Sequence, residues 1–306
     1  MPAFFSFLWH MPARIAAVAG VTFIQLMRMR LFAALAVVGI GFLALQFVPY
    51  QQNLGVEFQG VGQLQLMKDI ALGCMRLFCM LFCVAAAALL IPKDTEDRIL
   101  YTILCKPVPR FAYLAGKALG VLLLMGLMLL VMDGLLALLL HLREAVIEEE
   151  VRLVLTDRGW SAADMQPYLQ QVAEAGNSWN LQRSIVAMFL GFGVLTTFTL
   201  FLSCMTSGTI VSMLFALGAY FIGMFQGQLF HSMVAAQGGG EGVTLLWTER
   251  VVSILLPDFS LFSITDAASA GAELSGPLLG GLALIALAYM LLHLLAASWI
   301  FANKEF

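Results

Sequence analysis

The residues of this sequence that are best placed for chemistry with another molecule gather in one short segment, from Asp94 to Arg110. Asp94 can cap a helix whose third residue, Asp97, returns the bond, and prolines 107 and 109 would end that helix. Its apolar residues recur at helical spacing and would form one face: Ile99, Leu100, Ile103 and Leu104. A short helix with one apolar and one charged side suits insertion into a groove on another protein. The alternative is a solvated or lipid-facing connector.

Catalytic chemistry is not predicted. The four histidines are scattered, and the sequence has neither an HExxH motif nor a Ser-His-Asp candidate near one membrane depth. Gly116-Lys117-Ala118 lacks the glycine spacing and the hydroxyl of a phosphate-binding GxxxxGK[ST] loop. Cys79 and Cys83 share a helix face, but a metal site needs more ligands, so we expect them to pack as small apolar residues. The sequence therefore predicts no catalytic site, metal, cofactor or nucleic-acid partner for this chain.

The composition indicates an integral membrane protein, since 61% of the residues are hydrophobic and only 11% are charged. A hydrocarbon layer of about 30 Å needs roughly 20 helical residues. The apolar runs do not alternate as the strands of a membrane barrel would, so we predict an all-α fold. The six expected transmembrane helices cover residues 31–48, 70–91, 118–140, 185–205, 209–230 and 277–301.

The basic residues predict the orientation, because short loops rich in lysine and arginine stay cytoplasmic. They cluster before the first span, between spans two and three, and after the last span, whereas acids dominate the opposite side. With six spans, all three basic clusters fall on one side. We therefore expect both termini in the cytoplasm of a bacterium and the spans in its plasma (inner) membrane, surrounded by lipid.

The domain organisation follows from these spans. Residues 1–30 are predicted to form an interfacial helix, with Arg14, Gln25 and Arg28 near one face, and residues 31–306 the six-helix transmembrane domain. The alternative for the N-terminus is a basic flank that only sets topology. Two external helical segments are expected. One is an insert at about 143–180, a helical hairpin broken at Gly159, and the other lies at about 231–276.

Two charges fall inside predicted spans. Arg76 and Asp133 lie roughly 22–24 Å above the cytoplasmic ends of their helices, at a rise of about 1.5 Å per residue. Because an unpaired charge in lipid costs on the order of 3 kcal/mol, we predict a bridge between Arg76 and Asp133. Substrate contact and snorkelling toward the external surface are the alternatives. The glycines 116 and 120 permit close helix approach.

The run from Arg98 to Arg110, followed by Gly116 and Lys117, closely resembles the cytoplasmic segment of ABC-2 type transporter permeases. In that family an acidic start, a small hydrophobic helix, a lysine-proline step, an arginine and a glycine-lysine pair precede the third span. The N-terminal run from Ala19 to Phe32 also looks like that family's elbow helix. The family often has glycine-threonine after the acidic start, where this chain has Arg98-Ile99.

The resemblance implies a membrane permease subunit that couples ATP hydrolysis by a separate subunit to substrate movement, in the direction of export. Two such permeases, identical or related, would pair with two ATPases, which would hold the ATP and Mg²⁺. It implies an elbow helix that includes Phe23, Arg28 and Arg30. It also implies a coupling helix that docks on the ATPase through Asp94, Glu96, Asp97, Arg98, Leu100, Leu104, Lys106, Pro107 and Arg110.

Two other function classes remain open at this stage. A secondary transporter is expected to show paired broken helices or several midplane acids, and only Asp133 is available. A membrane-embedded enzyme would need the catalytic clusters that the sequence lacks. A neighbouring gene for an ATPase with a phosphate-binding loop would favour the permease over both.

Overall fold

The computed structural model describes residues 11–47, 61–97, 109–157, 159–206, 208–236, 256–264 and 275–303. These ranges contain helices and short connections and no β-strand, so the chain is an all-α membrane protein, as predicted. The helices in chain order are α2 (Met11–Met27), α3 (Arg30–Ala44), α4 (Val61–Glu96), α6 (Arg110–Asp157), α7 (Ala162–Ala175), α8 (Trp179–Met205), α9 (Thr209–Ala236) and α12 (Gly276–Asn303). Two 3-10 turns, η1 (Leu45–Phe47) and η4 (Ser260–Phe262), complete the described elements.

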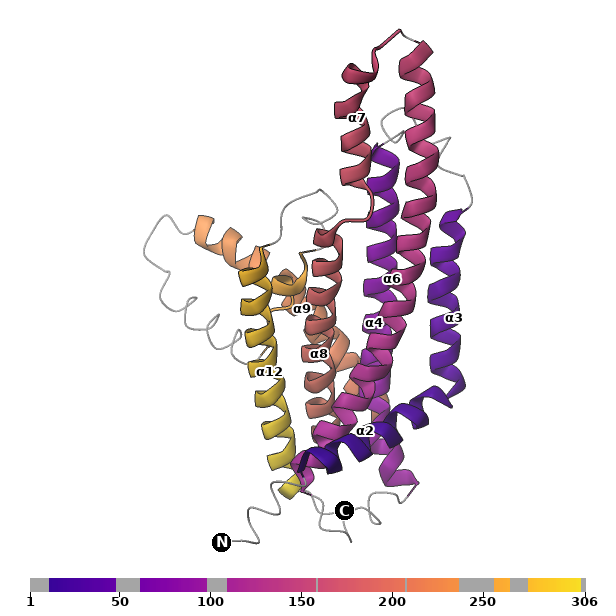
Figure 1. Cartoon of the computed structure of the whole chain (residues 1–306). Helices are drawn as coiled ribbons and strands as arrows, with labels where there is room; N and C mark the ends of the chain where they lie inside the picture. Colours follow the sequence, from indigo (N-terminus) through magenta and orange to yellow (C-terminus); the bar gives the residue numbers. More distant parts are fainter. Residues whose placement is uncertain are drawn as a thin grey trace.

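Five of these helices, α4, α6, α8, α9 and α12, are long and apolar enough to cross a membrane. A sixth crossing is present if α2 and α3, which meet at a bend of 69°, count as one broken span. The first predicted span corresponds to α3 with η1. Helix α2 runs across the foot of the bundle, transverse to the long helices (Figure 1). We call this end, which holds α2, the start of α6 and the end of α12, the basal end.

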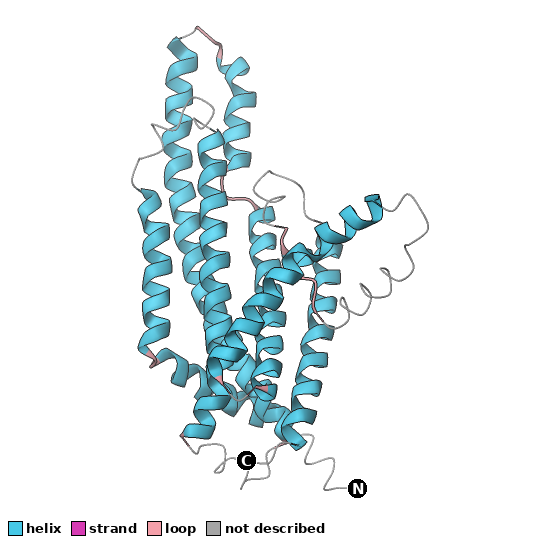
Figure 2. Cartoon of the chain, turned by 180° about the vertical axis from the view of Figure 1, so that it is seen from behind, coloured by secondary structure: helices cyan, strands magenta, loops and turns pink. Residues whose placement is uncertain are grey.

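Helices α4 and α6 are longer than the bilayer requires. Their 36 and 48 residues correspond to about 54 and 72 Å, against a hydrocarbon core of about 30 Å. The upper part of α6 and α7 form a hairpin that projects beyond the other helices, seen from both sides in Figures 1 and 2. The hairpin reverses at Gly159, whose φ of 76° favours glycine, so the predicted break is confirmed.

The structure adds one detail to the predicted hairpin. The third span and the charged helix that follows it are a single helix, α6, without a connection between them. No proline lies within α6, and its last glycine is Gly134, so nothing interrupts the backbone hydrogen bonds where apolar residues give way to charged ones. An exposed ion pair one turn apart, Arg152 to Glu148 at 2.7 Å, supports the upper part.

Helix α8 is central, since it packs against both α4 and α12. Its buried hydroxyls are satisfied within the bundle, as a water-free interior requires. Thr196 and Thr199 donate to carbonyl groups one turn earlier in α8, and Ser203 donates to the Ala88 carbonyl of α4 at 3.2 Å. The connection from α8 to α9 is as short as predicted, with Thr206 and Ser212 joined by their hydroxyl groups.

Candidate functional site

A buried ion pair joins α4 to α6 at the basal end. Lys117 Nζ lies 2.7 Å from Asp94 Oδ2, with side chains 4% and 0% exposed respectively. The Tyr113 hydroxyl donates to the same carboxylate oxygen at 2.5 Å. Tyr113 and Lys117 are four residues apart, so they lie on one face of α6 and reach Asp94 together. The other oxygen, Asp94 Oδ1, is buried without a hydrogen-bond partner.

The same lysine also reaches α2. Lys117 Nζ donates to Gln25 Oε1 at 3.3 Å and lies 5.7 Å from the centre of the Tyr113 ring. We call Gln25, Asp94, Tyr113 and Lys117 the basal cluster. Its four side chains come from three helices, and charge-assisted hydrogen bonds in a low-dielectric interior are stronger than those in water. The basal cluster therefore couples the positions of α2, α4 and α6.

Two glycines of α6 bring α2 close enough for this contact. A Cβ atom added to Gly116 would lie 2.6 Å from Val18 Cβ, and one added to Gly120 would lie 2.6 Å from Thr22 Cβ. Real Cβ atoms do not approach so closely, so any larger residue would force the helices apart. The close approach that the sequence suggested at these glycines is therefore between α6 and α2.

The end of α12 joins the same region. Arg110 Nη1 donates to the Phe301 carbonyl at 3.2 Å, and the Phe301 ring stacks on Tyr113 with centroids 5.9 Å apart. A guanidinium group that donates to a carbonyl oxygen near a helix C-terminus also meets the negative end of the helix dipole. The first two turns of α6 thus contact α2, α4 and α12.

The predicted coupling residues separate into three groups. Asp94 was predicted to cap a following helix, and this prediction was wrong, because Asp94 lies inside α4 and is held there by Lys117 and Tyr113. Glu96 and Asp97 are exposed at the end of α4, and Arg110 is exposed at the start of α6. Five residues lie outside the described part of the chain: Arg98, Leu100, Leu104, Lys106 and Pro107.

The predicted elbow residues lie at the end of α2 and the bend that follows it. Phe23 is half-buried in α2 and packs against the core, whereas Arg28 and Arg30 are exposed on either side of the turn into α3. The helix itself covers Met11–Met27, and residues 1–10 of the predicted interfacial segment lie outside the described ranges. Three basal-cluster residues were not singled out as site residues from the sequence, namely Gln25, Tyr113 and Lys117. The four-residue spacing of Tyr113 and Lys117 was the available signal.

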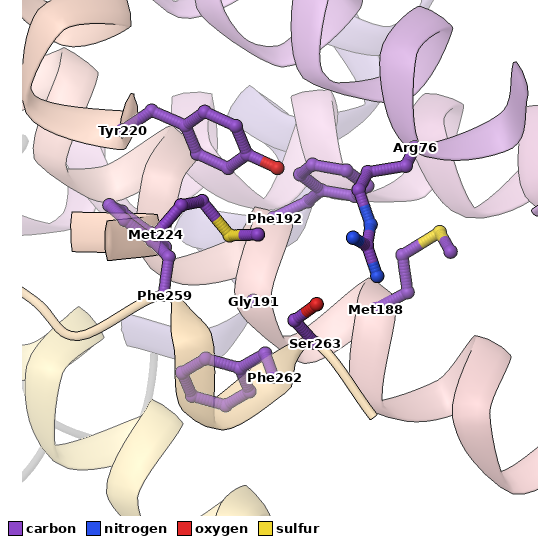
Figure 3. Close-up of a pocket in the computed structure, with 9 residues that line it drawn as sticks. All are labelled: Arg76, Met188, Gly191, Phe192, Tyr220, Met224, Phe259, Phe262 and Ser263. Atoms are coloured by element: carbon purple, nitrogen blue, oxygen red, sulfur yellow. The ribbon is translucent and has the colours of Figure 1, made fainter. Parts of the chain in front are cut away.

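The two intramembrane charges have different neighbours from those predicted. Asp133 Oδ1 accepts a hydrogen bond from Gln182 Nε2 of α8 at 3.0 Å. Arg76 points instead into a pocket between α4, α8 and α9, with Tyr220 and Ser263 nearby (Figure 3). Within the described residues, the ion pairs are Lys117–Asp94 and Arg152–Glu148, so the Arg76–Asp133 bridge is not among them.

We expect Asp133→Asn to cost less than about 1 kcal/mol of stability, because asparagine keeps an oxygen that accepts from Gln182. Asp133→Leu should cost about 1–3 kcal/mol, since it leaves the Gln182 amide without this partner. Thermal unfolding of the purified chain in neutral detergent measures both. Adding Arg76→Leu should change stability additively. A rescue of Asp133→Leu by Arg76→Leu would show instead that the two charges interact directly.

Comparison with protein families supports a transporter subunit. The family model described as CcmB protein matches residues 21–157, which is under half of the 306-residue chain. The matched stretch runs from α2 to the end of α6 and so contains the whole basal cluster. No curated protein matches the sequence. Over residues 21–157 the chain is therefore similar to CcmB permeases, and this similarity supports a membrane permease of an ABC transporter.

Proposed function

We propose that this chain is the membrane-spanning subunit of an ABC transporter of the ABC-2 type, driven by a separate ATPase that docks at the basal end. The observation that carries the proposal is the basal cluster, which ties α2, α4 and α6 together beside an exposed acidic helix end. The chain has no phosphate-binding loop, so ATP and Mg²⁺ would be held by the partner. The direction we propose is export, with both termini in the cytoplasm of a bacterium and the bundle in its plasma membrane.

The proposed mechanism begins at the connection between α4 and α6. This connection leaves α4 at Glu96 and Asp97 and enters α6 at Arg110. A partner that binds the connection would therefore move both α4 and α6. Asp94 and Lys117 are buried, and separating them would expose two charges to a low-dielectric interior. The helices therefore move together with α2 when the ATPase closes around nucleotide. A second permease copy or a related chain would complete the complex, because the ATPases of such transporters work in pairs.

The interface is tested by reversing the exposed charges at the end of α4. We expect Glu96→Lys with Asp97→Lys to lower copurification of the partner ATPase by about tenfold or more, since like charges placed across an interface cost several kcal/mol. Both residues are exposed, so the reversal should leave the folded bundle intact. The readout is the amount of ATPase retained by the tagged permease, at equal permease yield.

The matched control is Glu149→Lys with Glu150→Lys, the same change at exposed residues near the far end of α6. It should leave copurification unchanged. Equal retention of the ATPase by the wild type and the α4 variant would contradict docking at this end of the bundle.

A further inference from the structure

A pocket away from the basal end combines a cation with aromatic walls. Its lining comes from four elements, α4, α8, α9 and the segment 256–264, and Figure 3 shows the side chains around it. The residues that line it are Arg76, Met188, Gly191, Phe192, Tyr220, Met224, Phe259, Phe262 and Ser263. Arg76 lies 20 positions before the end of α4, roughly 30 Å along the helix, so the pocket is in the half of the bundle away from α2.

The wall formed by residues 256–264 is built into the helix bundle. A Cβ on Gly191 would lie 2.8 Å from Phe262 Cβ, and one on Gly223 would lie 2.6 Å from the Pro257 carbonyl oxygen. These glycines leave notches in α8 and α9 that receive the segment. Phe259 and Phe262 are only 2% and 4% exposed, and Asp258 Oδ1 accepts from the Ser260 amide and hydroxyl groups. The segment is therefore packed as part of the core.

The polar side chains that line the pocket can all donate hydrogen bonds to a ligand. The Arg76 guanidinium points inward and the hydroxyl groups of Tyr220 and Ser263 lie beside it, so all three lining polar side chains can donate hydrogen bonds (Figure 3). A guanidinium carries five N–H donors in a fork that matches carboxylate or phosphate oxygens, so it can hold a ligand besides protein partners. The rest of the lining is apolar. Apolar pockets with a few convergent polar groups are the usual form of small-molecule sites.

The size of the pocket limits what enters it. Its free volume is about 20 Å³, enough for one water-sized group, and the pocket is partly open. An anionic head group fits at Arg76 if neighbouring side chains adjust, and Met188 and Met224 are flexible thioether chains that can do so. The apolar remainder of a ligand would contact the aromatic side chains of the lining, Phe192 and Phe262 among them. An ion without an apolar part would gain nothing from these walls.

We propose that this pocket binds an anionic amphiphile, with its carboxylate or phosphate group on Arg76 and its apolar body against the aromatic walls. The proposal concerns binding by this chain alone and does not depend on the ATPase. Three probes with the same alkyl chain length distinguish the contribution of the head group to binding from that of the apolar chain: dodecanoate, dodecyl phosphate and dodecanol. Dodecanoate and dodecyl phosphate distinguish the two kinds of head group, and dodecanol reports the apolar contribution.

The test is a calorimetric titration of each probe into the purified full-length chain in neutral detergent. At least one anionic probe should bind about tenfold or more tightly than dodecanol, as expected for a charge-assisted hydrogen bond. Arg76→Gln should remove this preference, whereas Arg76→Lys should keep part of it. Arg152→Gln, at an exposed arginine on the projecting part of α6, is the control and should bind like the wild type.

Two results of these titrations would overturn the proposal. Dodecanol binding as tightly as both anions would overturn the proposal with the wild-type chain alone, even if Arg76→Gln failed to fold. Retention of the full anion preference in a folded Arg76→Gln chain would overturn it too. Ser263→Ala and Tyr220→Phe keep the guanidinium and remove one hydroxyl each, and a two- to tenfold loss of anion affinity in either, on the order expected for one hydrogen bond, supports the assigned head-group position.

Discussion

Replacing Lys117 with methionine is expected to lower the stability of the folded chain by about 3–5 kcal/mol, since it leaves the Asp94 carboxylate buried with only Tyr113 to bond it. The side chain of Asp94 is 0% exposed, so water cannot replace the lost ammonium group. Thermal unfolding in neutral detergent, followed by the fraction of monodisperse protein, measures the effect. Loss of the contact with Gln25 should also loosen α2 from α6.

The double variant Asp94→Asn with Lys117→Met is the matched control. It removes the charge that the single variant leaves unpaired, so it should recover most of the lost stability. Arg152→Met breaks an ion pair on the same helix, but that pair is exposed, and the expected cost is below about 1 kcal/mol. A Lys117→Met chain as stable as Arg152→Met would show that the buried pair does not hold the basal end together.

The second large effect is expected from Gly120→Leu. A single added Cβ would already lie 2.6 Å from Thr22 Cβ and 2.9 Å from the Ala19 carbonyl oxygen, so a leucine must displace α2. Overpacking a close helix contact costs about 1–3 kcal/mol and occasionally more when backbone must shift. We expect a lower unfolding temperature together with reduced copurification of the ATPase, because the displaced α2 pulls Gln25 away from Lys117.

Gly134→Leu provides the comparison on the same helix. Nothing lies within 4 Å of a Cβ at Gly134, so leucine finds open space there. It should be neutral or stabilise the helix by up to about 1 kcal/mol, since glycine is a poor helix former. Equal losses in the two variants would argue that glycine itself, and not the contact with α2, matters in α6.

The sequence predicted the long helices well because hydropathy is a local property. The end of α8 at Met205 and the start of α9 at Thr209 coincide with the predicted limits, since polar residues separate two apolar runs there. The sequence placed the end of the third span at 140 and a helical hairpin broken at Gly159 after it, and the structure joins the span and the first arm of the hairpin in one helix that ends at Asp157. Hydropathy falls after residue 140, but charged residues are good helix formers and the helix continues into the projecting hairpin.

The site was harder to predict because its contacts are distant in sequence. Asp94 meets Tyr113 and Lys117 across the connection between two helices, and Gln25 comes from a third helix. Counting residues placed Arg76 and Asp133 at similar heights, but the rotation of each helix about its own axis decides which neighbour a side chain meets. Asp133 faces Gln182 and Arg76 faces the pocket with Tyr220, and a one-dimensional pattern does not contain that rotation.

Because α6 is one unbroken helix, a tilt at its lower end moves its upper end as well. It runs as one helix from Arg110, beside the basal cluster, to Asp157 at the turn of the hairpin. A tilt of roughly 5° about its lower end would swing the tip by roughly 6 Å, given a length of about 72 Å. A small movement at the basal end would thereby become a larger displacement at the tip of the hairpin, because α6 has no break between the two ends.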